Sequence, residues 1–427
     1  MQLIIHPPKD QWKELLQRPY ADNTTVTDAV QAILNAVKQH GDEALWSFTK
    51  KYDSVELTSF SVTQQELLQG ADAVPAGLKE AINQACRNIE AFHKMQLQEE
   101  ERMETMPGVV CWRKRVGIER VGLYIPGGTA PLFSTVLMLG VPAMLAGCRE
   151  VILCTPVSKD GSLNPALLYA AQLVGINRIY KLGGAQAIAA MAIGTETVPA
   201  VHKIFGPGNQ YVTAAKQLVQ TMGVAIDMPA GPSEVCVLAD DTADADFVAA
   251  DLLSQAEHGA DSQVLLVSTS EKLVQAVSEA LQQQLSRLPR KDIAEKALAN
   301  SKALVLQDAA EALALVNEYA AEHLIICCEN ADSIAEAVVN AGSVFIGNYA
   351  PESVGDYASG TNHTLPTNGF AKAYSGVSVD SFVKKITFQK LSAEGLSQIA
   401  DTVITLAEAE GLQAHANAVK IRTASHD

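Results

Sequence analysis

Four short β-rich runs follow one another along the chain at nearly equal intervals, and each ends in Gly or Pro. They start at residues 121, 150, 178 and 202, which makes the spacings 29, 28 and 24 residues, and they read VGLYIPGG, EVILCTPV, RIYKLGG and HKIFGPG. Because consecutive parallel strands need a crossover of a dozen or more residues, this spacing predicts alternating strands and helices. The continuous apolar runs favour a parallel sheet that is covered on both faces.

A second series of the same kind follows. Its runs are SQVLLVS from 262, ALVLQ from 303, HLIICC from 323 and GSVFIG from 342, again with helical segments between them. The fold class that we predict is therefore α/β, with two Rossmann-like parallel-sheet domains and small helical segments at the N- and C-termini.

The helical segments carry apolar stripes and end signals. The N-terminal stripes are Val30, Ile33, Leu34 and Val37 up to Gly41, and then Leu78, Ile82, Ala85, Ile89 and Phe92. Thr63 and Glu66 match a capping box, which predicts that another helix begins between these two stripes. A final helix from about Ser392 to Glu410 is predicted to turn Leu396, Ile399, Val403 and Leu406 toward a core, and Gly411 suits its end.

Net charge and cysteine usage indicate which partners and which cell compartment to expect. The 427 residues include 32 Lys and Arg against 48 Asp and Glu, a net charge of −16, which disfavours nucleic acid as a partner. The seven cysteines are scattered and mostly lie in apolar stretches, which favours reduced thiols in a cytoplasmic protein, and no secretory signal is recognised. Residues 121–148 carry no charge, but their prolines and glycines favour a strand, a turn and a buried helix over a membrane span.

Four Gly-rich turns are predicted to lie at the carboxyl ends of strands, and they read YIPGGTAP, LGGAQAIAA, FGPGNQYV and MPAGPSE. In parallel sheets ligands bind at the carboxyl ends of the strands, where Gly lets backbone N–H groups approach a phosphate or another flat ligand. None of the four turns fits the GxGxxG pattern. The residues alone therefore indicate a ligand site, without identifying a dinucleotide.

A polar set in the second half could bind a metal. Gln255 and His258 are three residues apart, Glu322 and His323 stand where a helix passes into a strand, and Asp356 and His363 share a predicted loop. His, Asp and Gln side chains together suit a borderline metal such as Zn²⁺, although each alone is more typical of surface or capping chemistry.

Seven segments, in order along the chain, resemble histidinol dehydrogenases. They are VGLYIPGGTAPLFSTVLML, GGAQAIAA, KIFGPGN, IDMPAGPSEV, DLLSQAEHG, EHLII and ESVGDYASGTNH, and the resemblance extends to HANAVKIR near the C-terminus. It implies an aldehyde dehydrogenase-like fold and an NAD-dependent oxidation of L-histidinol through L-histidinal to L-histidine, the last steps of histidine biosynthesis. It also implies a homodimer with shared active sites, one Zn²⁺ per subunit and no membrane partner.

The resemblance assigns roles residue by residue. The zinc ligands would be Gln255, His258, Asp356 and His415. The substrate would contact these four residues together with Ser233, His323, His363 and Glu410, and NAD would contact Tyr124, Gln186 and Asn209. His415 and Glu410 would complete the site of the neighbouring subunit.

The residue types suit this chemistry. A His near neutral pKa can take the hydroxyl proton as hydride leaves, which we assign to His323. Glu322 would activate the water that hydrates the aldehyde. Zinc would hold the substrate by its imidazole and amino nitrogens, acting more as a template than as a Lewis acid.

Pattern and resemblance together predict four segments. These are an N-terminal segment (1–20), a discontinuous first α/β domain (21–120 with 235–377), a second, NAD-binding α/β domain (121–234) and a dimer-swapped C-terminal helical segment (378–427). The alternatives are a related NAD-dependent alcohol or aldehyde dehydrogenase with another amino- or hydroxy-alcohol substrate, an aldehyde dehydrogenase-like enzyme with a thiohemiacetal on Cys111 or Cys154, and a two-lobed binding protein.

Overall fold

The structure, a computed structural model, describes residues 1–18, 24–127, 132–229 and 231–424 in two compact units. The first unit comprises Met1–Gln96 and Ile118–Phe382, and the second comprises Leu97–Gly117 and Val383–Asp427. The predicted boundary at residue 20, residues 128–131 of the first Gly-rich turn and Ala230 of the last one lie outside the described residues.

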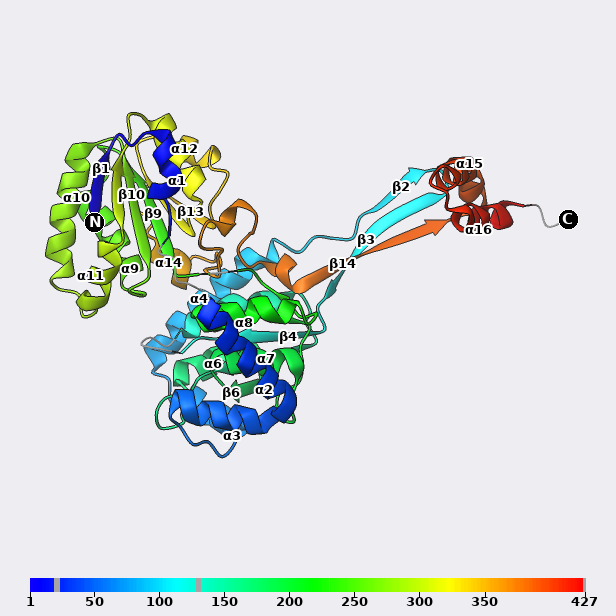
Figure 1. Ribbon diagram of the computed structural model, residues 1–427, viewed down its shortest axis with the longest axis horizontal. Helices are drawn as coiled ribbons and strands as arrows, with labels where there is room; N and C mark the ends of the chain where they lie inside the picture. Colours follow the sequence, from blue (N-terminus) through cyan, green and yellow to red (C-terminus); the bar gives the residue numbers. More distant parts are fainter. Residues whose placement is uncertain (19–23, 128–131, 230, 425–427) are drawn as a thin grey trace. The chain divides into compact units, whose positions relative to one another are not determined.

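Sheet A of the first unit is a parallel sheet with the order β1-β11-β10-β9-β12-β13 (Figure 1). Its strands are β1 (Gln2–Ile5), β9 (Glu234–Ala239), β10 (Gln263–Ser268), β11 (Lys302–Val305), β12 (His323–Cys327) and β13 (Ser343–Ile346). The associated helices are α1 (Trp12–Leu15), α9 (Ala245–Ala256), α10 (Glu271–Leu285), α11 (Lys291–Ala299), α12 (Ala309–Tyr319), α13 (Ala331–Glu336) and α14 (Glu352–Tyr357). Alternate residues of the central strand β9 enter two different cores, so both faces of the sheet are covered.

Sheet B, also in the first unit, is parallel with the order β6-β5-β4-β7-β8. Its strands are β4 (Arg120–Tyr124), β5 (Glu150–Thr155), β6 (Arg178–Lys181), β7 (Lys203–Phe205) and β8 (Ala225–Ile226). Helices α2 (Thr24–Phe48), α3 (Gln64–Asp72), α4 (Ala76–Lys94), α5 (Phe133–Leu145), α6 (Pro165–Leu173), α7 (Gly184–Ile193) and α8 (Gln210–Gln220) pack around it.

These two sheets confirm the predicted fold class. All eight predicted runs form parallel strands, and each series, counted in chain order from β4 or from β9, has the Rossmann-like order 3-2-1-4-5. Short helical turns at Lys9–Gln11, Thr49–Asp53, Phe370–Lys372 and Val379–Phe382 complete the first unit.

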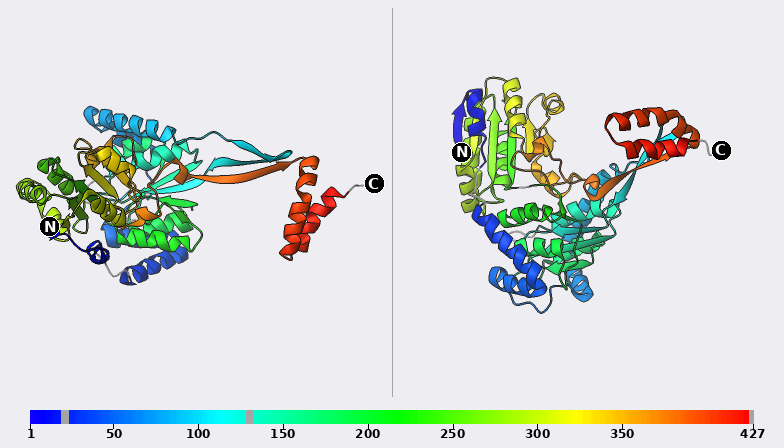
Figure 2. Two further views of the ribbon diagram at one scale, coloured as in Figure 1. Left: turned by 90° about the horizontal axis from the view of Figure 1, so that it is seen from above. Right: turned by 45° about the vertical axis from the view of Figure 1, so that its right-hand side comes forward.

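The second unit contains an antiparallel ribbon that the sequence did not predict. Strand β14 (Val383–Leu391) pairs along its whole length with β3 (Val109–Gly117), and β2 (Arg102–Met106) pairs on the other side of β3. Both views of Figure 2 show the ribbon beside the terminal helices, which are α15 (Ala393–Ala409) and α16 (Gln413–Thr423). The segment predicted as helical, residues 378–427, therefore includes a nine-residue strand.

Two helix predictions are confirmed by local geometry. Thr63 and Glu66 form the capping box of α3, with both reciprocal hydrogen bonds present. Helix α2 is interrupted at Gly41, where φ is 50° and ψ is −128°. A side chain there would meet the Glu196 carboxylate, whose oxygen instead accepts a hydrogen bond from the Asp42 N–H.

Two predicted stripes are partly wrong. In α4 the buried positions include His93 rather than Phe92, which is 40% exposed. In α15 the buried residues are Gly395, Ala400 and Ala407, and Leu406 is 61% exposed, so the predicted inward stripe is not covered within this chain.

The packing also differs from the sequence-based division. That division places α2 to α4 in the domain that contains residues 235–377, but these helices pack against the helices of sheet B. Residues 97–117, placed in the same domain, group instead with the C-terminal helices. Within residues 121–148, the described parts form β4 and the buried helix α5. No helix in the described ranges has the length and apolar character needed to cross a membrane.

Candidate active site

Glu322 and His323 lie at the predicted junction, immediately before and at the first residue of β12. Helix α12 ends at Tyr319, and Ala320 takes the left-handed conformation (φ 54°) that turns the chain toward the strand. Both side chains are buried. An oxygen of Glu322 accepts a hydrogen bond from the Glu234 N–H at 2.9 Å and lies 3.7 Å from Nδ1 of His323.

On its other side, His323 faces Asp356. Its Nε2 lies 3.4 Å from Oδ1 of Asp356, and the imidazole centroid is 6.0 Å from that of Phe345. The ring is therefore held between two carboxylates. This arrangement suits a group that accepts and releases a proton, because the nearby carboxylates stabilise the protonated ring.

A set of possible metal ligands adjoins this histidine. Candidate ligand atoms of His258, Glu352 and Asp356 all lie within 4.8 Å of one another. Among the described residues, the buried atoms without a hydrogen-bond partner include both ring nitrogens of His323, Nε2 of Gln255 and Oε2 of Glu352. Unsatisfied buried polar atoms are costly, so their presence beside a possible ligand set points to an additional group bound here.

Glu352 was not identified from the sequence. It begins α14, and its other oxygen accepts a hydrogen bond from Ser254 at 2.8 Å. Its spacing to Asp356 could have revealed it, since residues four apart share one face of a helix. The same helix corrects another expectation, because Asp356 lies in α14 rather than in the loop that contains His363.

Charges within this group shift the pKa values strongly. Burial raises the pKa of Glu322 to about 8 and that of Glu352 to about 7. Burial would lower the pKa of His323, but Glu322, Asp356 and Glu352 outweigh it and raise that pKa to about 10. Burial likewise raises the pKa of Asp356, but its histidine neighbours hold it below the usual value. The site is thus an acidic environment that favours a cation.

His258 belongs to this cluster, and two further predicted residues, Ser233 and His363, lie beside it. His258 directly follows α9 and its C-cap, and its N–H donates to the Gln255 carbonyl at 3.2 Å. His363 contacts the Asp356 carbonyl through Nδ1 at 2.8 Å and the Thr135 hydroxyl through Nε2 at 3.1 Å. Ser233 precedes β9, so it stands next to the residue whose N–H binds Glu322.

Glu410 and His415 belong to the second unit. Glu410 is the C-cap of α15 and His415 lies in the first turn of α16, and both are exposed on that unit. Their predicted contribution to a site formed with another subunit stays a prediction.

The residues assigned to NAD lie at the carboxyl ends of sheet B strands. Tyr124 ends β4, and its hydroxyl accepts a hydrogen bond from the Gly184 N–H at 3.0 Å. Gln186 is buried in the first turn of α7. Asn209 is exposed and caps α8, its side-chain oxygen accepting from the N–H groups of Tyr211 and Val212. β4 and β7 are the strands at which the order of sheet B reverses, which is where such sheets bind ligands.

All seven cysteines, each within a described range, are free thiols. Cys154 is fully buried in β5, and burial raises the pKa of its thiol far above the usual value, which disfavours a nucleophilic thiolate. Cys111 lies on β3 in the second unit.

Comparison with known proteins shows what this chain is related to. Residues 16–423 match the family model described as histidinol dehydrogenase. A curated histidinol dehydrogenase of Bacteroides thetaiotaomicron is 58% identical over 99% of both chains. The crystal structure of histidinol dehydrogenase from Elizabethkingia anophelis has 54% identity and a TM-score of 0.96, covering 99% of this chain and 98% of that one.

The chain belongs to the histidinol dehydrogenase family.

The family resemblance stated from the sequence is therefore confirmed. A crystal structure titled NAD-dependent aldehyde dehydrogenase, from Sinorhizobium meliloti, shares only 14% identity but has a TM-score of 0.51, covering 86% of this chain and 87% of that one. At that identity the likeness concerns the fold alone. It agrees with the aldehyde dehydrogenase-like architecture expected for the histidinol dehydrogenase family.

Proposed function

We propose that this chain oxidises L-histidinol to L-histidine through L-histidinal, reducing two NAD⁺, as the last steps of histidine biosynthesis. The observation that carries the proposal is the position of His323 between Glu322 and Asp356, beside a set of metal-ligating side chains. Oxidising an alcohol to an acid needs one acceptor for the hydroxyl proton and a second for the water that hydrates the aldehyde. Membership of the histidinol dehydrogenase family supports the substrate.

A zinc ion fits the donors of this site. His258, Glu352 and Asp356 offer the imidazole nitrogen and carboxylate oxygens that a borderline metal accepts, and the amide oxygen of Gln255 is proposed to join them. The unpartnered Oε2 of Glu352 supports this assignment. When bound, zinc would hold the imidazole and amino nitrogens of the substrate. Its positive charge would also counteract the carboxylates that raise the pKa of His323, and so would lower that pKa.

In the first step His323 accepts the hydroxyl proton while hydride leaves the carbinol carbon for the first NAD⁺. The carboxylates of Glu322 and Asp356, whose oxygens lie 3.7 and 3.4 Å from the two ring nitrogens, stabilise the imidazolium that results. The product is L-histidinal.

In the second step Glu322 takes a proton from water as that water adds to the aldehyde, which gives the hydrated aldehyde. With that proton on Glu322 the hydrate is an oxyanion, so loss of a second hydride from its carbon to the second NAD⁺ gives the carboxylic acid directly. Glu322 then releases its proton to solvent. Burial raises the pKa of Glu322 to about 8, which makes the carboxylate a stronger base than an exposed one.

NAD is proposed to bind at the carboxyl ends of β4 and β7, with Tyr124, Gln186 and Asn209 in contact with it. The hydrogen bond between Tyr124 and Gly184 joins two of the Gly-rich turns there. The start of α8 offers the N-terminal end of a helix dipole, which favours a diphosphate.

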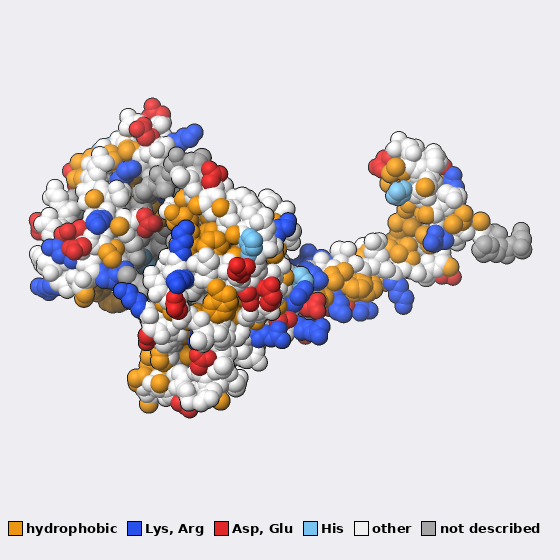
Figure 3. All heavy atoms as spheres, turned by 60° about the horizontal axis from the view of Figure 1, so that its bottom comes forward, with side chains coloured by type: hydrophobic (Ala, Val, Ile, Leu, Met, Phe, Trp, Pro, Cys, Tyr) orange, Lys and Arg blue, Asp and Glu red, His pale blue; other side chains and the backbone are white. Residues whose placement is uncertain are grey.

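We further propose a homodimer in which His415 and Glu410 complete the site of the second copy. Figure 3 shows apolar side chains gathered on the helical end of the second unit. The exposed large apolar residues of this unit include Leu406, Leu412 and Ile421. A second copy that covers this surface would also account for the uncovered stripe of α15.

Subunit mixing tests the shared site. Glu322→Gln and His415→Asn subunits, each inactive alone, should regain about a quarter of wild-type activity when mixed in equal amounts, because about half of the dimers are hybrids and each hybrid has one intact site. Mixed subunits that exchange, as measured with tagged chains, but stay inactive would overturn the shared-site proposal.

The activity itself is tested by supplying histidinol and histidinal separately and counting NADH, with two NADH expected per histidine formed. Glu322→Gln should slow histidinal oxidation more than histidinol oxidation, and Glu329→Gln, the same change at an exposed position just after β12, should slow neither. If the zinc-loaded protein forms no NADH with histidinol, or prefers another amino alcohol, the proposed substrate is wrong and the chain is a related dehydrogenase. Normal turnover by Cys111→Ser and Cys154→Ser would exclude thiohemiacetal chemistry.

A further inference from the structure

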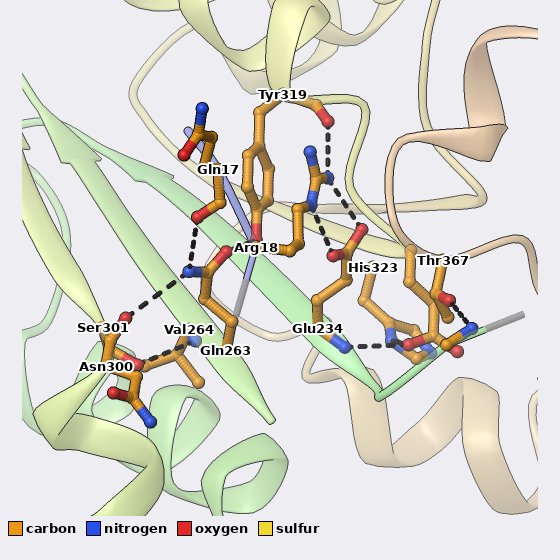
Figure 4. Close-up of polar contacts among 12 residues, drawn as sticks. Gln17, Arg18, Glu234, Gln263, Val264, Asn300, Ser301, Tyr319, His323 and Thr367 are labelled. Atoms are coloured by element: carbon orange, nitrogen blue, oxygen red, sulfur yellow. Dashed lines mark hydrogen bonds and ion pairs between the residues drawn. The ribbon is translucent and has the colours of Figure 1, made fainter. Parts of the chain in front are cut away.

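A buried polar network connects the N-terminal segment with Glu322. The Arg18 guanidinium donates to both oxygens of Glu234, from Nε at 2.8 Å and from Nη2 at 2.9 Å. Nη2 also donates to the Tyr319 carbonyl at 2.6 Å, and the guanidinium lies 3.8 Å from the centre of the Tyr319 ring. Figure 4 shows Arg18 between the ring of Tyr319 and the side chain of Glu234.

The same network continues through the neighbouring strand. The Tyr319 hydroxyl donates to the side-chain oxygen of Gln263 at 2.9 Å, and the Gln263 backbone N–H donates to the Ser233 carbonyl at 3.2 Å. The Gln263 amide in turn donates to the carbonyls of Gln17 and Asn300 (Figure 4). The start of β9 is thus fixed from both sides.

This network holds both ends of the hydrogen bond that Glu322 accepts. The donor is the N–H of Glu234, whose side chain Arg18 binds. The acceptor follows Tyr319 by three residues, and Arg18 binds the Tyr319 carbonyl and ring. One guanidinium therefore sets the spacing between the start of β9 and the turn that leads from α12 into β12.

Stability alone is a weak reason for such a pair. The side chains of Arg18 and Glu234 are 17% and 2% exposed, so both charges are largely removed from water. The desolvation of a buried ion pair can cancel its attraction, and apolar residues often replace one without loss of stability. What the fork of an arginine provides is a fixed geometry, because its planar donors bind a carboxylate at two points.

We propose that Arg18 and Glu234 are positioning residues for Glu322: their ion pair holds the Glu234 N–H against one carboxylate oxygen, so that the other oxygen is aimed at the water that attacks the aldehyde. The inference rests on the proposed function, in which Glu322 activates that water. Neither residue touches the substrate or transfers a proton. Their effect is expected in the second oxidation and not in the first.

The test measures the two half-reactions of Arg18→Gln and Glu234→Gln in the zinc-loaded enzyme. Each variant should lower kcat for histidinal oxidation about 10- to 100-fold, the loss that a misplaced catalytic group produces. KM for histidinal and kcat for histidinol oxidation should change less than about 3-fold, since neither residue binds substrate. The double variant should lose about as much as either single variant, because one substitution already breaks the ion pair.

Lys302→Gln is the matched control. Lys302 donates to the Leu15 carbonyl and so ties the same N-terminal segment to β11, without contact to Glu234 among the bonds described. It should leave the ratio of the two half-reactions unchanged. If Arg18→Gln does not fold, Arg18→Lys serves instead: it keeps a cation but not the fork, and about a 3- to 10-fold loss in histidinal oxidation is expected.

Three results overturn the inference: equal losses in both half-reactions, no loss in either, or the same change in ratio with Lys302→Gln. These results differ from a failure of the proposed function. If the wild-type enzyme forms no histidine, or if Glu322→Gln spares histidinal oxidation, the role of Glu322 itself is wrong. If those two controls behave as proposed and Arg18→Gln does not, only the positioning role is wrong.

Discussion

The buried pair Lys216 and Asp227 supports the turn that contains Asn209, and breaking it should be costly. The two side chains are 5% and 1% exposed and form an ion pair. Lys216 donates to the Gly206 carbonyl at 2.8 Å, and Asp227 accepts from the N–H groups of Gly206 and Met228, each at 2.8 Å. The pair therefore binds both backbone groups of Gly206, three residues before Asn209.

Lys216→Met removes the cation with little change in side-chain length. Removing one partner of a buried pair costs about 3–5 kcal/mol, because the other charge stays buried. The two N–H groups that Asp227 retains should keep the loss near the lower end, about 3 kcal/mol, out of a total free energy of unfolding of about 5–15 kcal/mol. KM for NAD should rise as well if the turn binds the cofactor.

The assay is urea unfolding followed by tryptophan fluorescence, with Lys372→Met as the control. Lys372 pairs with Glu318 on the surface, with side chains 42% and 57% exposed, so the same substitution there should cost less than about 1 kcal/mol. Adding Asp227→Asn to Lys216→Met should recover part of the loss, since no lone charge is left. Equal losses for Lys216→Met and Lys372→Met, or a double variant that is worse than the sum of its parts, would refute the reasoning.

Three further predictions use other parts of the first unit. Burial raises the pKa of Asp251 from 3.8 to about 7, so between about pH 4 and 7 the folded state binds a proton that the unfolded state has lost, and the free energy of unfolding falls as pH rises. Asp251→Asn should remove up to about 4 kcal/mol of that fall, as measured by urea unfolding at several pH values. Gly206→Ala should lower the free energy of unfolding by several kcal/mol and weaken NAD binding, because at φ +121° the new Cβ would lie 2.0 Å from the Tyr124 carbonyl oxygen. In the control Gly223→Ala the new Cβ meets no atom within 4 Å, and the loss should be only about 1 kcal/mol. Zinc at about 100 times its Kd should stabilise the chelator-treated protein by about 2.7 kcal/mol in thermal unfolding, and His258→Asn should abolish that shift.

The parallel sheets could be predicted because their signal is local. Each strand of sheets A and B that we recognised is a short β-rich run with a helical segment after it, and the runs of sheet B end in Gly or Pro, as in EVILCTPV. The capping box of Thr63 and Glu66 is equally local. Such features depend on neighbours within a few residues of the sequence.

The ribbon of the second unit could not be predicted in the same way. β3 carries Arg113, Lys114 and Arg115 in succession, so it lacks the alternation typical of a half-buried strand. Its partner β14 lies more than 250 residues away in the sequence, since Val383 pairs with Gly117. Nothing in either segment alone indicates that pairing.

The helices between residues 24 and 94 illustrate a second limit. Their apolar stripes correctly indicate that one face is buried, since Val30, Leu34 and Val37 lie in a core. A stripe does not say which sheet it covers, and here it covers sheet B. Prediction of the candidate site has the same limit. The resemblance supplied residues and roles, whereas the unpartnered oxygen of Glu352 could be found only from the packing of the folded chain.

The two parallel sheets share one strand order but offer opposite edges to their proposed ligands. At the carboxyl ends of sheet B, α7 and α8 begin, and helix N-termini carry partial positive charge that suits a diphosphate. At the amino ends of sheet A, α9 and α12 end just before β10 and β12, and helix C-termini carry partial negative charge. Glu322, Glu352 and Asp356 add carboxylates near that second edge. The proposed cationic substrate and metal ion would be stabilised there by helix ends, as the proposed dinucleotide would be at the other edge, so one topology could serve ligands of opposite charge.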